Sequence, residues 1–310
     1  MKSRLLVAAV ACLGYAILNA TPANAADKYA HSTGDWSGAN VWYSDDCEST
    51  PTNGVTKPTS ADHAYICGVT VTVEDFDEAA QQVTVKSSGM IEIDPDDNSR
   101  TLTLGSGEAE ALSTLESTAG IRLKDDMDGT NVAKLTFATV DHRFRGLGRI
   151  VGEDVLAQVD IPSLLTMTID VDSEESPTGW VSIEGRLKIM GSGTFDNQRQ
   201  VHANADGTLD MLLTGMIQDT AITGDVSSTN HRWGVSSHTD ATLRFNNLDL
   251  LCNADKELLG AFYVGAGTLR IGSEGTDDIE IEVTDRLLLE TSGKVEAGPD
   301  DSIAFNVTCP

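Results

Sequence analysis

Basic residues are scarce in this chain. Its 310 residues include 21 lysines and arginines against 48 aspartates and glutamates, which gives a formal charge of −27 at pH 7. Nucleic-acid binding depends on basic side chains that neutralise phosphates, and anionic membranes likewise attract basic surfaces. We therefore expect neither nucleic acid nor membrane insertion. The acidic surface keeps the protein soluble and attracts cations.

The motifs of several common enzyme classes and metal sites are also missing. There is no Gly-x-x-x-x-Gly-Lys-Ser/Thr loop for a nucleotide phosphate and no Gly-x-Ser-x-Gly elbow for a hydrolase serine. No Cys-x-x-Cys motif or nearby His pair supplies a zinc site. One acidic stretch fails the EF-hand pattern, because Lys124 falls on the first ligand position and Leu135 on the last. We expect no metal site or cofactor, although acidic clusters at 94–98, 125–128 and 170–172 leave calcium open.

Long apolar runs are absent beyond the first 25 residues, which are typical of a signal peptide. Two basic residues precede the mostly apolar segment 5–18, and Ala23-Asn24-Ala25 has the small-x-small pattern of a signal-peptidase site. The apolar run of about 14 residues is shorter than the roughly 20 that cross a membrane. We expect cleavage before Ala26 and a secreted or cell-surface protein; a retained signal anchor is the alternative. The mature chain would carry a charge of about −29.

Four cysteines lie beyond this segment: Cys47, Cys67, Cys252 and Cys309. An even number in an exported chain favours disulfides, and four cysteines allow three pairings. We favour the near-neighbour pairs Cys47–Cys67 and Cys252–Cys309. The first pair would close a short loop in a segment with few apolar residues, contributing about 3 kcal/mol.

A short cassette recurs along the chain: alternating apolar residues, a turn with a small residue, then alternation again. Clear copies lie at 83–93, 181–189 and 263–271, and related units begin at 120, 207, 241 and 293. Alternation with period two is typical of β-strands. One cassette cannot bury its apolar face, whereas parallel stacking at intervals of about 20 to 35 residues builds a continuous core. We expect an all-β solenoid in which glycine allows positive φ at the turns.

The chain is predicted to have three parts. Residues 1–25 are the signal peptide, 26–68 an N-terminal cap containing Cys47 and Cys67, and 69–310 the β-solenoid with a closing strand near its end. Exposed sheet edges pair with other chains, so both ends need covering. Within the solenoid, the spacing of Ala109, Leu112 and Leu115 predicts a short helical turn between cassettes.

Two features carry a resemblance to a known group. They are the cassettes over 69–305 and an opening that contains Gly34-Asp35-Trp36, Trp42, Pro58, Ala61-Asp62 and Ile66 before Val69-x-Val71-x-Val73. Together they resemble the secreted right-handed parallel β-helix proteins, which include autotransporter passengers and pectin-lyase-like proteins. The resemblance implies that fold and export, but no particular activity. A β-sandwich or jelly-roll assembly is the alternative fold.

The densest basic cluster is Asp141-His142-Arg143-x-Arg145-x-x-x-Arg149. Asp141-His142 is similar to an Asp-His pair of pectate lyases, which implies arginine as a base and carboxylates that hold calcium. The companion Arg-Pro motif is absent. The other interpretation is a salt-bridged cluster that faces neighbouring carboxylates. We assign no catalytic residue, and Asp141, His142, Arg143 and Arg145 are the candidates if the protein is an enzyme.

The function that we favour is a non-catalytic structural or interaction protein of the cell exterior, either an adhesin-like solenoid or a self-assembling subunit. Its partners would be extracellular polysaccharide, cell-surface components or further copies of itself. The alternatives are a polysaccharide lyase or glycosidase, and a glycan-binding protein that uses Trp36, Trp42, Trp180 or Trp233. With 48 acidic residues, carboxylate pairs at a glycosidase spacing arise by chance and discriminate nothing.

Overall fold

A computed structural model describes residues 25–105, 111–126, 129–169 and 182–197, followed by the separate strands β18 to β28 given below. Their side chains are described at 25–105, 111–126, 129–153, 156–169, 184–196 and 209. Their regular secondary structure consists of β-strands. No helix among them is long and apolar enough to cross a membrane. The predicted signal peptide up to residue 24, and Cys252 with Cys309, lie outside the described residues.

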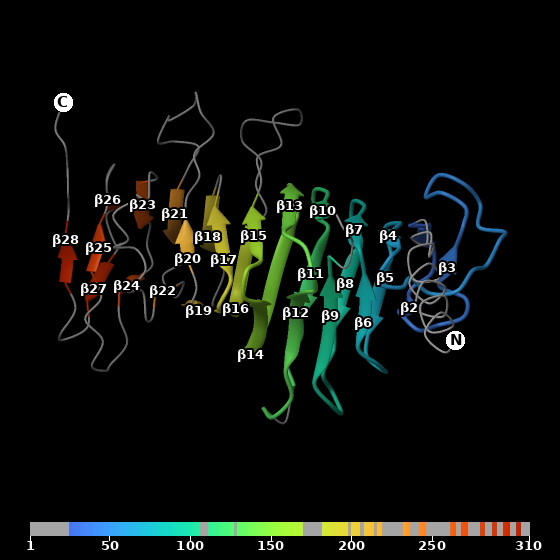
Figure 1. Cartoon of the computed structure of the whole chain (residues 1–310), viewed down its shortest axis with the longest axis horizontal. Coiled ribbons are helices and arrows are strands. Elements are labelled where there is room, and N and C mark those ends of the chain that lie inside the picture. Colours follow the sequence, from blue (N-terminus) through green and yellow to red (C-terminus); the bar gives the residue numbers. More distant parts are fainter. Residues whose placement is uncertain are drawn as a thin grey trace, which may run out of the picture.

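The described strands form three sheets (Figure 1). Sheet A has nine strands: β1 (Asp27–Ala30), β3 (Trp42–Tyr43), β4 (His63–Ile66), β7 (Gln82–Val85), β10 (Ala111–Leu115), β13 (His142–Gly146), β15 (Thr166–Ile169), β17 (Thr194–Asn197) and β20 (Met216–Gln218). Sheet B has 17 strands: β2 (Gly34–Asp35), β5 (Thr70–Val73), β6 (Glu78–Ala80), β8 (Met90–Ile93), β9 (Arg100–Leu104), β11 (Gly120–Leu123), β12 (Ala133–Phe137), β14 (Arg149–Ile161), β16 (Ser182–Gly191), β18 (Gln200–Asn204), β19 (Thr208–Leu213), β21 (Arg232–Val235), β22 (Thr242–Phe245), β23 (Ala261–Val264), β24 (Thr268–Ile271), β26 (Leu287–Leu289) and β27 (Lys294–Ala297). The third sheet pairs β25 (Glu280–Glu282) with β28 (Ser302–Ala304).

Neighbouring strands pair in parallel throughout the described sheets, except where β3 runs antiparallel to β1. The same position returns after 20 residues from Thr70 to Met90 and after 33 residues from Arg149 to Ser182. These intervals fall within the expected range. A jelly roll is built from antiparallel strands, so its pairing differs from the one seen here. The chain is therefore an all-β protein of long parallel sheets, which is consistent with a solenoid.

Two long strands, β14 and β16, each pair along their length with two shorter strands of sheet B. β14 pairs with β11 up to Gly152 and with β12 from Gln158, and its register with β16 shifts between these two stretches. At this corner Gly185 has a φ of +76° and lies in register with Gly152. A Cβ at Gly185 would lie 1.9 Å from the Gly152 carbonyl oxygen. Both the conformation and the close approach therefore require glycine there.

We expected glycine to supply the positive φ at the turns, and this is wrong for the turn between β7 and β8. The residue with positive φ in that turn is Ser88, at 68°, and Thr118 has the same conformation in the turn between β10 and β11. Gly89 is needed for space, because a Cβ there would lie 2.9 Å from the Lys86 carbonyl oxygen. The turn closes through the Gly89 N–H, which donates to that carbonyl.

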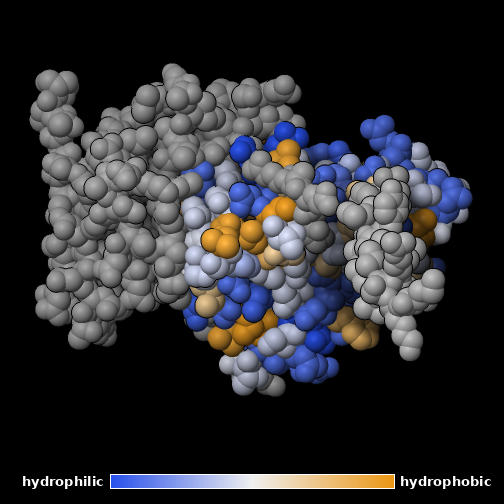
Figure 2. All heavy atoms as spheres, viewed as in Figure 1, coloured by the Kyte–Doolittle hydropathy of each residue, from blue (hydrophilic) through white to orange (hydrophobic). Residues whose placement is uncertain are grey.

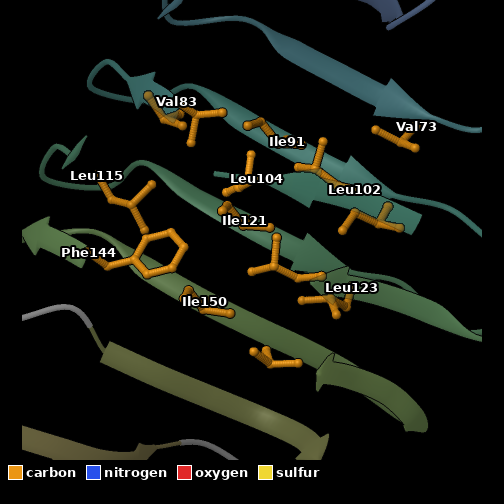
Figure 3. Close-up of a cluster of buried hydrophobic side chains, with 14 of the residues drawn as sticks. Val73, Val83, Ile91, Leu102, Leu104, Leu115, Ile121, Leu123, Phe144 and Ile150 are labelled. Atoms are coloured by element: carbon orange, nitrogen blue, oxygen red, sulfur yellow. The ribbon is translucent and has the colours of Figure 1, made fainter. Parts of the chain in front are cut away.

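The core consists of apolar rows that run across the strands. Ile91 of β8, Ile121 of β11 and Ile150 of β14 are in register and fully buried. Figure 3 shows these side chains in the interior, with Leu102 and Phe144 from the neighbouring strands. Burying one such side chain contributes about 1.5–3 kcal/mol. The rows thus hold successive strands together.

The helical turn predicted through Leu112 and Leu115 is wrong, because Ala111–Leu115 forms strand β10. Ala111, Ser113 and Leu115 face the interior, whereas Leu112 faces outward. The polar Ser113 at an inward position hides the period of two, and the two leucines then mimic helical spacing. Ser113 is tolerated inside because its Oγ accepts a hydrogen bond from the Val83 N–H at 3.0 Å.

The N-terminal end of sheet A is covered by β3 and the loop that follows it. Trp36 and Trp42 are fully buried, with ring centroids 4.9 Å apart, and the indole N–H of Trp42 donates to the Trp36 carbonyl. The predicted Cys47–Cys67 disulfide is confirmed, with a Cα–Cα distance of 5.1 Å. It ties the loop after β3 to the end of β4.

Ion pairs connect the outer rows of side chains. Arg122 lies between Glu92 at 3.0 Å and Glu153 at 3.4 Å, and Lys124 bonds to Asp94. Partly exposed pairs of this kind contribute at most about 1 kcal/mol each. Polar residues cover most of the described surface in Figure 2, where apolar residues form small separate groups. The ion pairs therefore contribute little free energy, and their main effect is to favour this alignment of neighbouring strands.

Replacement of Gly185 by alanine is expected to lower the free energy of unfolding by more than about 2 kcal/mol, from positive φ and steric overlap together. Urea denaturation measures this loss. Gly54→Ala is the matched control, because no atom lies within 4 Å of a Cβ built there. Equal stability of the two variants would contradict the bend described at this corner.

Loss of the Cys47–Cys67 disulfide is expected to cost about 3 kcal/mol, since it closes a loop of 20 residues. The double variant Cys47→Ser with Cys67→Ser, compared with the parent by thermal unfolding, measures this. A reductant would also act on any bond between Cys252 and Cys309, so the variant is the cleaner test. An unchanged melting temperature would mean that the disulfide does not constrain the chain.

Candidate interaction surface

The outer face of sheet A carries two parallel rows of side chains, because alternate residues of each strand point away from the core. One row is in register from strand to strand and consists of Tyr29, Tyr65, Thr84, Thr114 and Arg145. The other row lies beside it and includes Asp27, His63, Gln82, Leu112 and Arg143. One row begins with the Tyr29 ring and the other with the Asp27 carboxylate, and both end with a guanidinium group. We call these ten residues the outer face of sheet A.

The N-terminal part of this face is aromatic. The rings of Tyr29 and Tyr65 stack with centroids 4.6 Å apart and planes inclined by 17°. His63 lies beside Tyr65 at 4.1 Å. Burial raises the pKa of both tyrosines, and the negative charge of Asp27 adds to this effect. The phenols therefore stay protonated at neutral pH, when their hydroxyl groups can donate hydrogen bonds.

His63 is a neutral part of the scaffold. Gln82 Nε2 donates to His63 Nδ1 at 3.0 Å, which leaves the proton on Nε2, where it is donated to Thr84 Oγ1 at 2.9 Å. Gln82 Oε1 accepts from the Leu112 N–H of the next strand. Burial lowers the pKa of His63 to about 4, although Asp27 acts in the opposite direction. The ring thus joins β4 to β7, Gln82 extends the link to β10, and the ring carries no charge at pH 7.

The other end of the face is basic. Arg143 and Arg145 are two residues apart on β13, so both point outward. Arg145 Nε donates to Thr114 Oγ1 at 3.2 Å. Planar guanidinium groups can make paired hydrogen bonds to carboxylates and to sugar hydroxyls. This end of the face suits oxygen-rich ligands.

Strand alternation separates His142 from the other predicted candidate catalytic residues. His142 points into the core, whereas Arg143 and Arg145 point outward from the same strand. The Asp141 carboxylate accepts a hydrogen bond from the Thr166 N–H at 2.7 Å and so holds the start of β15. Arg149 begins β14 in sheet B and lies 3.5 Å from Glu184. The cluster is dense in the sequence, but strand alternation disperses it.

The buried His142 is held by core groups. Its Nε2 lies 2.8 Å from Ser113 Oγ, and the ring packs against Phe137 and Phe144. Its Nδ1 has no hydrogen-bond partner within the described part of the chain. Burial lowers the pKa of His142 to about 3. The imidazole is therefore neutral at physiological pH, out of reach of a substrate on the surface.

The tryptophans considered for glycan binding do not lie on this face. Trp36 and Trp42 are fully buried, Trp180 lies outside the described residues, and the side chain of Trp233 is not among those described. The rings on this face belong to half-buried tyrosines, which the sequence patterns did not indicate. One signal could have located them. Tyr29-Ala30 and Tyr65-Ile66 have the same pattern, in which a tyrosine precedes a buried apolar residue.

The acidic clusters are used within the fold where they are described. Asp94 is paired with Lys124, and the Asp126 carboxylate accepts hydrogen bonds from the Thr130 and Asn131 N–H groups. Among the described residues, no group of three or more His, Cys, Asp or Glu side chains converges as a metal site would require. The cluster at 170–172 lies outside those residues.

Acid is expected to destabilise the protein through His142. Its pKa is about 3 in the fold against 6.5 in the unfolded chain, so between these values the unfolded state binds a proton that the native state does not. Stability is retained above pH 6.5 and lost as the pH falls, by about 3 kcal/mol between pH 7 and pH 4. Unfolding free energies at several pH values measure this loss.

The matched comparison uses His142→Gln, which keeps a partner for Ser113 but does not titrate. Its stability should fall less steeply over the same pH range, whereas acid effects of the carboxylates are common to both proteins. His63→Gln should flatten the profile less, since the ring of His63 is less buried. Identical profiles for the parent and His142→Gln would contradict a buried neutral imidazole.

Comparisons with protein-family models, with curated proteins and with solved structures find no match for this chain. The function proposed below therefore rests on the residues of this chain alone.

Proposed function

We propose that the protein is an exported, non-catalytic interaction protein of the cell exterior, which binds extracellular polysaccharide through the outer face of sheet A. In this proposal residues 1–25 are a cleaved signal peptide, 26–68 a cap and 69–310 a right-handed parallel β-helix. The observation that carries it is the outer face itself: two rows in register, one of which begins with stacked phenols, and each of which ends in an arginine. A flat row of this kind suits an extended ligand better than a small one.

The parallel pairing supports the scaffold. Within sheets A and B, neighbouring strands pair in parallel, and the rows of buried side chains continue from one strand to the next. The disulfide at Cys47–Cys67 supports an oxidising compartment, since such bonds persist mainly outside the cytosol. Both observations favour an exported β-helix.

The N-terminal end favours an adhesin-like protein over a subunit that grows end to end through this edge. The edge strand β3 is two residues long, and Tyr43 forms an antiparallel bridge with Gly54 in the loop beyond it. Asp45 holds the same loop by accepting hydrogen bonds from the Thr52 and Asn53 N–H groups. Short, covered edges resist pairing with a second chain.

The chemistry of the outer face supports a polysaccharide partner. The phenols of Tyr29 and Tyr65 and the guanidinium groups of Arg143 and Arg145 are donors toward the oxygen atoms of sugars. The two rings stack on each other, so a ligand meets mainly their edges and hydroxyl groups. Arginines attract acidic sugars locally, whereas the acidic remainder of the chain repels any polyanion, so attraction to an acidic polymer would come from this end of the face. An uronate-containing polysaccharide fits these conditions best.

Binding of the purified protein to immobilised neutral and uronate-containing polysaccharides tests this proposal. The double variant Arg143→Gln with Arg145→Gln should bind the acidic polymers at least about tenfold more weakly, because hydrogen bonds to charged groups contribute about 1.5–3 kcal/mol. Lys134→Gln is the matched control, since it removes a positive charge from an outward position of sheet B. Its affinity should be unchanged.

Four results would contradict the proposal. Failure of the parent protein to bind any polymer, or equal loss in the control, would exclude the outer face as the binding surface. Release of reducing ends or unsaturated products from the same polymers would show an enzyme instead. Concentration-dependent growth in X-ray scattering, with or without calcium, would favour a self-assembling subunit.

A further inference from the structure

Ala26 is the first residue that the fold holds in place. Its carbonyl accepts a hydrogen bond from the His63 N–H at 3.0 Å, and pairing between β1 and β4 continues from Asp27 onward. Its own N–H donates to Asp62 Oδ1 at 3.1 Å. The preceding Ala25 is exposed. The hydrogen bonds that join the start of the chain to β4 thus begin at the residue that follows the predicted cleavage point.

Asp62 is a buried carboxylate, 8% exposed, with its oxygens divided between two partners. Oδ2 accepts hydrogen bonds from the N–H and the hydroxyl of Thr59, while Oδ1 faces Ala26. Burial by itself would raise the pKa of Asp62, but the hydrogen bonds from Thr59 and Ala26 and the charge of Lys28 outweigh it, so the pKa is lowered. The group is therefore ionised at neutral pH, beside the nitrogen of Ala26.

Cleavage after Ala25 changes the chemistry of this contact. Hydrolysis of the Ala25–Ala26 peptide bond by signal peptidase consumes one water: its oxygen remains on the new Ala25 carboxylate, and the Ala26 nitrogen becomes an amine. An α-amine has an ordinary pKa of about 7.7–8.0, so it is protonated at neutral pH. A neutral amide donor is thereby replaced by an ammonium group next to a buried carboxylate.

We propose that export processing creates an ion pair between the Ala26 α-ammonium and Asp62 that holds β1 against β4. This inference rests on the exported state of the proposed function. Hydrogen bonds between charged groups are roughly twice as strong as neutral ones, and an ion pair with a buried partner is little screened. The mature chain is therefore held at its first residue by a bond that the precursor cannot make.

The ion pair acts on the outer face of sheet A. β1 supplies Asp27 and Tyr29, and the Tyr29 ring forms the first member of the aromatic row by stacking on Tyr65. Fraying of β1 would remove this ring and would expose the edge of β4. Processing thus completes the aromatic end of the surface, as well as releasing the protein.

The test uses the exported protein and the same protein acetylated at its α-amine. Reaction of the amine with an acylating reagent is followed by mass spectrometry across pH, in native and urea-unfolded samples. Asp27, Lys28, Asp62 and His63 are the charged or titratable groups near this amine. The native amine should react roughly tenfold more slowly at pH 7 than the unfolded one, which corresponds to an upward pKa shift of about one unit.

Asp62→Asn removes the charge while keeping the hydrogen-bonding shape, and Asp27→Asn is the matched control at an exposed neighbour. Acetylation should lower the melting temperature of the parent and of Asp27→Asn, but not that of Asp62→Asn. Equal effects in all three proteins, or equal reactivity of the native and unfolded amines, would overturn the ion pair. The reactivity measurement on the parent stands even if Asp62→Asn does not fold.

Failure of the predicted cleavage and failure of the ion pair give different results. If the exported protein begins at a residue other than Ala26, or keeps residues 1–25, the mass of its N-terminal peptide shows it, and the predicted export processing is wrong. If the chain begins at Ala26 but the amine behaves as in the unfolded state, only the ion pair is wrong.

Discussion

Parallel pairing places each residue beside its counterpart on the next strand, at a strand spacing of about 4.8 Å. An inward position must therefore be filled by a side chain that fits both neighbours, as Ile121 fits between Ile91 and Ile150. Outward positions obey the same rule: Arg122 pairs with Glu92, and Tyr65 stacks on Tyr29. The core, the ion pairs and the aromatic row all follow from this constraint.

The constraint also decides which polar residues are available for function. Ser113 and His142 lie on neighbouring inward rows and hydrogen-bond to one another, so a serine and a histidine that look reactive in the sequence are structural. The outward rows of sheet A point away from the core. They present a surface that extends from strand to strand, whose first ring depends on the anchoring of β1 through Ala26 and Asp62. In the proposed function, folding, processing and recognition therefore all depend on the N-terminal end of sheet A.

Alternation in the sequence predicts most of this arrangement, because a clean period of two fixes both the strand and its buried face. Prediction fails where one residue breaks the pattern: Ser113 faces inward, so β10 resembles a helical turn. It fails again for Ser88, since the residue with positive φ at a turn depends on geometry around the neighbouring Gly89. The tyrosines were missed because only register across strands shows that Tyr29 and Tyr65 lie side by side.

The in-register parallel stacking is tested most directly by spin labels on outward positions of β9 and β12. Two doubly labelled proteins are required, one at Thr101 and Lys134 and one at Thr103 and Thr136, which are paired positions. Parallel pairing predicts strong dipolar coupling in both, since each pair of Cα atoms is about 5 Å apart. Weak coupling in either protein would contradict the stacking on which the core, the outer face and the proposed function depend.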